Sequence, residues 1–106
     1  MIRAEFFQSN GYLSGFSISG HADMAKLGEP DVICAAVSSA VQLVANGITE
    51  ICREQVSVDV KENLISLTEK DGLSQNGRCF LEALLLHLQL LCEDSPNAIK
   101  IIITEV

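Results

Sequence analysis

The sequence predicts an α+β fold of two layers, with two helices packed on a mostly antiparallel sheet. Three observations lead to this class: two pairs of strand-like segments joined by short turns, a helical run after each pair, and a last strand-like run. The predicted order is ββαββαβ, within a single domain of residues 1–106. Hydrophobic residues make up 48% of the chain, enough to form a core.

The first two strands are predicted at residues 2–7 and 12–19. Both segments are rich in apolar side chains, and they flank the turn signal Asn10-Gly11. Asn-Gly between two such runs favours a tight hairpin, because both residues tolerate the positive φ angles that this turn requires. The sequence therefore predicts an antiparallel pair at the start of the chain.

The first helix is predicted from Val32 to about Ile51. Asp31 is a good N-cap, Pro30 precedes it, and an apolar-rich run follows. This cap places Cys34 at the third helical position. The helix is small and apolar nearly all round, so it is expected to be either the central helix of the domain or part of a subunit interface.

A second hairpin is predicted in the middle of the chain. Residues 55–60 alternate polar and apolar side chains, and residues 64–68 repeat this pattern after a turn at 61–63. Alternation with a period of two is typical of a strand with one exposed face.

The last two elements are a helix and a strand. Leucines at helical spacing predict a helix over about 77–93, with Ser74 or Asn76 as its cap. The apolar run at 99–106 predicts the final strand. Together with the two hairpins, these elements complete the expected fold.

Charge and composition narrow the classes of partner. Fourteen Asp and Glu against seven Lys and Arg leave a net charge of −7, which disfavours nucleic-acid binding and suits a basic protein or peptide. The start of the chain lacks the pattern of a secretory signal, and the apolar runs look too short and interrupted for a bilayer, so a cytoplasmic protein without membrane contact is expected. Four cysteines without a Cys-x-x-Cys pair are expected to be free thiols. Neither a cofactor nor a metal is predicted, since no Gly-rich phosphate loop is present.

Cys34 is the strongest candidate for chemistry. A cysteine among Val, Ile and Ala is usually a small buried hydrophobe. Here, however, the thiol lies in the first turn of a helix, where unpaired backbone N–H groups and the helix dipole favour the thiolate. The adjacent Asp31 and the loop before the helix add to this interpretation, so Cys34 is a candidate nucleophile.

His21 is the candidate base. It follows the first hairpin, thirteen positions before Cys34. Its alternative is a solvent-exposed loop histidine without chemistry. If the imidazole reaches Cys34, it can accept the thiol proton and then deliver it to a leaving amine. Asp31 and, less strongly, Asp23 are candidates for orienting the imidazole.

Further groups could complete such a site. Ser38 lies one helical turn after Cys34 on the same face, either as a small residue tolerated in close packing or as a polar group in the pocket. The backbone N–H groups of Cys34 and Ala35 are candidates for an oxyanion hole.

The motif Gly20-His21-Ala22, followed by Asp-Val-Ile-Cys-Ala-Ala-Val-Ser at residues 31–38, resembles the signature of the ribosomal-processing cysteine protease family, Prp, also catalogued as YsxB-like proteins. The resemblance implies a homodimeric bacterial endopeptidase that removes an N-terminal extension from a large-subunit ribosomal protein, the one numbered twenty-seven, with a basic N-terminal region. It implies Cys34 as the nucleophile and His21 as its base. It also implies supporting roles and a loop that orders on the substrate peptide; the supporting residues are Asp31, Ser38 and Gly20, and the loop residues are Ala22, Asp23, Met24 and Gly28.

One alternative function stays open on the sequence alone. The chain could be a non-catalytic, ribosome-associated module that binds a basic protein, with Cys34 merely packed inside. A metal-binding form of this module would use His21, Asp31 and Cys34, but three scattered ligands make zinc a poor prediction.

Overall fold

The computed structural model describes residues 1–20 and 31–106. Its helices and strands follow the order ββαββαβ, which confirms the predicted fold class. The elements are β1 (Ile2–Ser9), β2 (Tyr12–Ser19), α1 (Val32–Asn46), the π-helical turn η1 (Gly47–Ile51), β3 (Val56–Lys61), β4 (Leu64–Glu69), α2 (Gln75–Asp94) and β5 (Ile99–Glu105).

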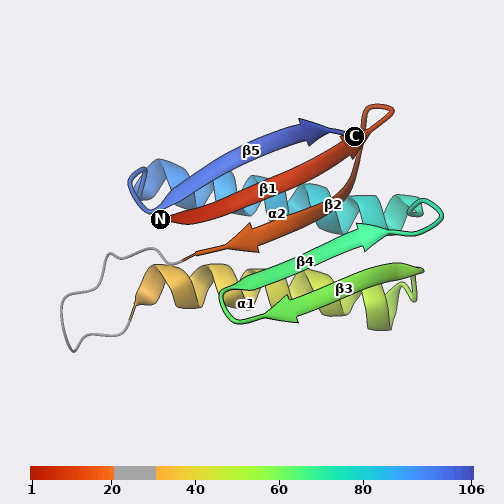
Figure 1. Cartoon of the computed structure of the whole chain (residues 1–106), viewed down its shortest axis with the longest axis horizontal. Helices are drawn as coiled ribbons and strands as arrows, with labels where there is room; N and C mark the ends of the chain where they lie inside the picture. Colours follow the sequence, from red (N-terminus) through yellow and green to blue (C-terminus); the bar gives the residue numbers. More distant parts are fainter. Residues whose placement is uncertain (21–30) are drawn as a thin grey trace.

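The strands form one sheet in the order β3-β4-β2-β1-β5. Neighbouring strands are antiparallel except β1 and β5, which are parallel. Both helices lie on the same face of the sheet, α2 behind the β1 side and α1 behind the β3–β4 side (Figure 1). The molecule therefore has two layers, as predicted, and the other face of its sheet carries no helix of the described chain.

The core lies between the helices and the sheet. β1 and β2 contribute apolar side chains that are at most 7% exposed; they are Ile2, Ala4, Phe6, Leu13, Phe16 and Ile18. They meet valines of α1 and leucines of α2, because both helices carry apolar residues at intervals of three and four positions. The largest fully buried side chains are Phe6, Phe16, Ile48, Leu67, Leu81, Leu84, Leu88, Ile99 and Val41.

The two hairpin turns form where the sequence predicts them. Asn10 and Gly11 both have positive φ angles, of 55° and 82°, which matches the tight turn expected for Asn-Gly. In the second hairpin, Asn63 adopts a φ of 63° between β3 and β4. Asparagine tolerates this left-handed conformation better than most residues.

The first predicted helix is confirmed, but its last turn differs from a regular α-helix. After Asn46 the chain continues as the π-helical turn η1. Gly47 at this junction lies against the ring of Phe80 in α2, and a Cβ there would come within 2.6 Å of ring carbons. Glycine therefore permits the close approach of the two helices.

The sequence analysis predicted that the apolar run of this helix is too short and too interrupted to cross a bilayer, and by length and composition that prediction is wrong. Among the described residues, the run Val32–Ile51 is 20 residues long with a mean hydropathy of 1.6, so by length and composition alone it could cross a membrane. Core helices pass the same test. Because Val37, Val41 and Val44 are buried in the sheet core, we describe α1 as a core helix.

The second helix begins at Gln75, two residues earlier than predicted. Ser74 is its N-cap, and its hydroxyl oxygen accepts a hydrogen bond from the N–H of Gly77, so one of the two predicted caps is confirmed. The carboxylate of Glu54 accepts hydrogen bonds from both the backbone N–H and the hydroxyl of Ser74. This contact ties the segment after η1 to the start of α2.

Candidate active site

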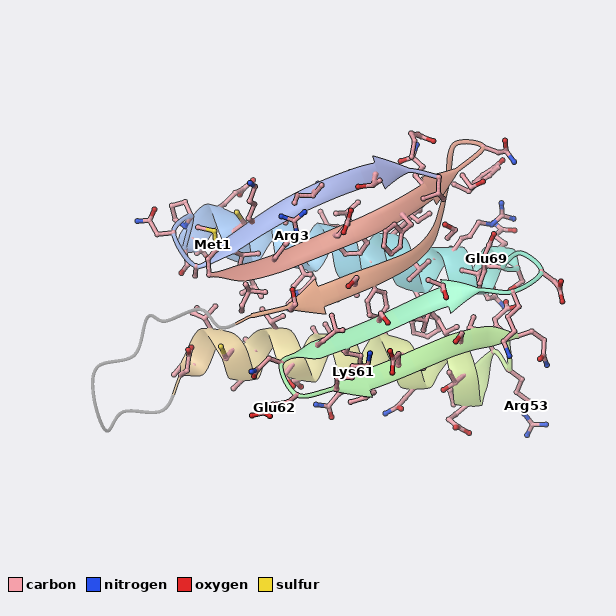
Figure 2. All side chains as sticks on the ribbon, viewed as in Figure 1. Met1, Arg3, Arg53, Lys61, Glu62 and Glu69 are labelled. Carbon is pink, nitrogen blue, oxygen red and sulfur yellow. The ribbon has the colours of Figure 1, made fainter. Side chains whose placement is uncertain are left out.

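A cleft of about 590 Å³ opens between α1 and the β3–β4 hairpin, beside the end of β2. Lys61 and Glu62 lie at the hairpin turn, beside the N-terminal half of α1 (Figure 2). The cleft is lined by both polar and aliphatic residues. It is lined by Ile2, Ile18, Ser19, Gly20, Cys34, Val37, Ser38, Val41, Gln42, Ala45, Asn46, Val58, Val60, Lys61, Asn63, Leu64 and Ile65.

Cys34 lies in the first turn of α1 and lines this cleft. Asp31 is the N-cap: its backbone is extended, with φ −85° and ψ 96°, and its Oδ1 accepts a hydrogen bond of 3.0 Å from the N–H of Cys34. The sequence placed Cys34 at the third helical position, and the structure confirms it. The residue is half-buried, so the thiol is neither sealed in the core nor fully in solvent.

The predicted oxyanion hole at the backbone N–H groups of Cys34 and Ala35 is wrong. The N–H of Cys34 donates to the side chain of Asp31, and the N–H of Ala35 donates to the Asp31 carbonyl oxygen at 3.1 Å. The prediction took the N–H of Cys34 to be unpaired. The side chain of an N-cap residue accepts a hydrogen bond from an N–H group in the first turn, and Asp31 does so here.

Gly20 connects the sheet to the predicted catalytic histidine. Its φ of +89° lies in the region that L side chains rarely adopt, and a Cβ would come within 2.6 Å of the carbonyl oxygen of Met1. Its N–H donates a 3.1 Å hydrogen bond to the carbonyl oxygen of Asn63 at the β3–β4 turn. The residue immediately before His21 is thus held between the N-terminus and the second hairpin.

Ser38 lies one turn after Cys34 and lines the same cleft. Its hydroxyl oxygen accepts a hydrogen bond of 2.9 Å from the side-chain amide of Gln42, one further turn along. The side chain is exposed, so it is a polar group at the cleft surface and does not take part in close helix packing.

The structure therefore places three of the residues singled out from the sequence around one cleft: Gly20, Cys34 and Ser38. The side chain of Asp31 accepts a hydrogen bond from the backbone N–H of Cys34. The remaining predicted site residues lie outside the described part of the chain; they are His21, Ala22, Asp23, Met24 and Gly28. Across residues 1–20 and 31–106, no group of three or more His, Cys, Asp or Glu side chains could hold a metal ion.

Sequence reasoning missed most of the cleft wall. Gln42 and Asn46 continue the four-residue spacing of Cys34 and Ser38 along α1, so helical periodicity could have found them. Val58 and Val60 belong to β3, and only the placement of that strand beside α1 brings them to the cleft. No local signal in the sequence marks them as site residues.

With this geometry, the chain can be compared with known proteins. The sequence model of the family described as cysteine protease Prp matches residues 1–100. A search of curated proteins finds no match.

Among solved structures, the ribosomal processing protease Prp of Staphylococcus aureus with a covalently linked product peptide has a TM-score of 0.89 and 20% identity, covering 98% of this chain and 100% of that one. The same protease with a substrate peptide has a TM-score of 0.86 and 20% identity over the same shares. The protein SMU.848 from Streptococcus mutans has a TM-score of 0.81 and 26% identity, covering 100% of this chain and 96% of that chain.

Proposed function

The chain belongs to the cysteine protease Prp family, and from that premise we propose that it removes the N-terminal extension of the large-subunit ribosomal protein numbered twenty-seven during bacterial ribosome maturation. The observation that carries the proposal is the position of Cys34, in the first turn of α1 and on the wall of a cleft of about 590 Å³. The Staphylococcus aureus relative, of the same fold, was solved both with a substrate peptide and with a covalently linked product peptide.

In the proposed reaction, His21 takes the proton of the Cys34 thiol, and the sulfur attacks the carbonyl carbon of the scissile peptide bond. The tetrahedral intermediate collapses as the C–N bond breaks, and the leaving amine receives the proton from His21. Water then attacks the thioester carbonyl while His21 accepts one of its protons. Breaking the C–S bond releases the carboxylic acid product and restores the thiol.

The other predicted residues support this chemistry. Asp31 holds the first turn of α1 through its cap, which orients the backbone that carries Cys34. Ser38 presents a hydroxyl to the cleft, and Gly20 sets the backbone at the start of the segment with His21. The loop residues Ala22, Asp23, Met24 and Gly28 are proposed to order on the bound peptide.

The proposed partners follow from charge and exposed apolar surface. A net charge of −7 suits a basic ribosomal protein and disfavours direct contact with RNA.

A homodimer is proposed, since α1 and η1 expose Leu43 at 70% and Ile51 at 77%. Sedimentation velocity measures this state, and a monomer at micromolar concentration contradicts it. Residues 1–106 would act as one protease domain, in the cytoplasm where ribosomes mature.

The test is incubation of the purified protein with the extended ribosomal protein, reading the new N-terminus by mass spectrometry. Cys34→Ala and His21→Ala are expected to abolish cleavage while the chain remains folded. Cys79→Ala is the matched control, because Cys79 is a free, exposed thiol on α2 outside the cleft. Iodoacetamide near neutral pH is expected to modify Cys34 before Cys79.

Retained cleavage by Cys34→Ala would contradict the proposal. Binding of the ribosomal protein without cleavage, unchanged in Cys34→Ser, would instead indicate the non-catalytic interaction module.

A further inference from the structure

The two edges of the sheet differ in how they are protected. β3 ends the sheet on one side, and its exposed Asp59 and Lys61 form an ion pair of 3.4 Å. β5 ends it on the other side and pairs with β1 alone among the described strands (Figure 1). Residues 101–103 in the middle of β5 include neither a charge nor a proline. Charged side chains and prolines commonly prevent another strand from pairing with an edge, so β5 is the unprotected edge.

The backbone of β5 has open hydrogen-bonding groups at alternate residues. The carbonyl oxygen of Ala98 accepts a hydrogen bond from Ile2, and the N–H of Val106 donates one to Gln8. Because a parallel ladder uses every second residue of a strand, the even-numbered residues of β5 bond to β1. The odd-numbered residues turn their N–H and C=O groups to the open edge; in the second half of the strand they are Ile101, Ile103 and Glu105.

A groove with apolar side chains in its walls runs beside this edge, between β5 and α2. It has a volume of about 490 Å³ and is lined by Leu86, Gln89, Leu90, Cys92, Glu93 and Ile101. We call it the edge groove. Leu86 and Leu90 lie one helical turn apart and are 57% and 52% exposed, and Ile103 on β5 is 50% exposed. The open backbone and this apolar surface therefore border each other.

The charges around the edge groove are mostly negative among the described residues. Glu93 lines the groove, and Glu82 and Asp94 each lie one turn of α2 from one of its leucines. Glu105 ends β5 and is exposed. The one cation of β5 is Lys100, whose side chain points to the sheet face opposite α2, since Ile99 and Ile101 on either side of it pack into the core. A segment that binds here is therefore expected to be basic.

We propose that the β5 edge binds an extended, basic segment of a partner protein, which adds a strand to the sheet and places alternate apolar side chains in the edge groove. An extended backbone presents N–H and C=O groups with the same two-residue period as the open groups of β5. That period also turns every second side chain of the segment toward Leu86 and Leu90.

A second copy of this chain is a poorer occupant of the β5 edge. Each copy carries a net charge of −7, and the carboxylates around the two edge grooves would meet. The inference is independent of the proposed function, because no residue that lines the edge groove lines the cleft of Cys34.

The first experiment measures binding of a fluorescently labelled peptide of four Lys-Val repeats to the full-length protein by fluorescence anisotropy. A peptide of four Glu-Val repeats keeps the apolar side chains and reverses the charge. It is expected to bind at least about tenfold more weakly, because its carboxylates meet those around the edge groove.

Substitutions in α2 test the edge groove. The doubly substituted Leu86→Ser, Leu90→Ser protein is expected to bind the Lys-Val peptide at least about tenfold more weakly, because two apolar contacts are lost. Leu43→Ser, Ile51→Ser is the matched control, since it removes two exposed apolar side chains from α1 and η1. It is expected to bind the peptide as the wild-type protein does. Melting temperatures verify that both proteins are folded.

Backbone hydrogen exchange followed by NMR tests the addition of a strand. In the free protein, the N–H groups of Ile102 and Thr104 are expected to exchange slowly and those of Ile101 and Ile103 rapidly. Saturating Lys-Val peptide is expected to slow exchange at Ile101 and Ile103 by at least about tenfold, because these groups then donate to the added strand.

Four results would overturn the inference. The first three are no binding of the Lys-Val peptide, equal binding of the two peptides, and unchanged binding by the Leu86→Ser, Leu90→Ser protein. The fourth is rapid exchange at Ile101 and Ile103 with the peptide bound. Slow exchange at both residues in the free protein that becomes rapid on dilution would also overturn it, and would indicate that a second copy of this chain occupies the β5 edge.

Discussion

The two hairpins of this protein are both antiparallel strand pairs, but their surroundings differ. In β1 and β2, the apolar side chains of the core are at most 7% exposed; they are Ile2, Ala4, Phe6, Leu13, Phe16 and Ile18. In β3, Val56 packs against the core, whereas Val58 is 40% exposed and Val60 is 69% exposed. The first hairpin thus forms the core, and the second one forms the wall of a cleft.

Position in the sheet explains this difference. β1 lies between β2 and β5, whereas β3 is an edge strand paired with β4 alone among the described strands. Two helices on one face cannot cover every strand of a five-stranded sheet to the same extent. The face of β3 left uncovered beside α1 forms part of the wall of the cleft that contains Cys34.

The largest expected effect contrasts one side chain from each hairpin. Phe6→Ala removes a completely buried ring of β1, and is expected to lower the free energy of unfolding by about 3–5 kcal/mol. Val60→Ala removes a largely exposed side chain and is expected to cost less than about 1 kcal/mol. Urea unfolding followed by circular dichroism measures both. Equal losses would contradict the division into a core hairpin and a cleft hairpin.

A smaller effect is expected at the point where the hairpins meet. Gly20→Ala places a methyl group 2.6 Å from the Met1 carbonyl oxygen and forces alanine to adopt a φ of +89°. Gly11→Ala imposes a similar φ, +82°, at a turn with open space around it. Both variants incur about 1–2 kcal/mol for the left-handed backbone, and Gly20→Ala is expected to lose about 1–3 kcal/mol more because of the clash.

The two glycine substitutions are also expected to differ in their effect on kcat for peptide cleavage. Gly20 precedes His21 and bonds to Asn63, so Gly20→Ala should reduce kcat for peptide cleavage while Gly11→Ala leaves kcat unchanged. The comparison is made at a temperature where both variants are fully folded. An equal effect of the two substitutions on kcat would show that Gly20 acts only through stability.

Local signals in the sequence predicted much of this arrangement. Asn10-Gly11 marked the first hairpin, Asp31 marked the start of α1, and Ser74 marked the start of α2, because caps and tight turns depend on a few adjacent residues. The Asp31 cap therefore sufficed to predict Cys34 in the first helical turn. The π-helical end of the first helix was not predicted; Gly47 at this junction lies against Phe80, which is far from it in the sequence.

By itself, the sequence determined the order of the elements, the position of the candidate nucleophile and the family motif that surrounds it. The tertiary structure alone decided that Asp31 accepts a hydrogen bond from the N–H group of Cys34, that Asn63 accepts one from Gly20, and that two exposed valines of β3 line the same cleft as Cys34. The physical reason is the distance along the sequence between the interacting residues. Caps and turns are interactions between neighbours in the chain, whereas a cleft depends on which strand lies at the edge of the sheet and how far a helix covers it.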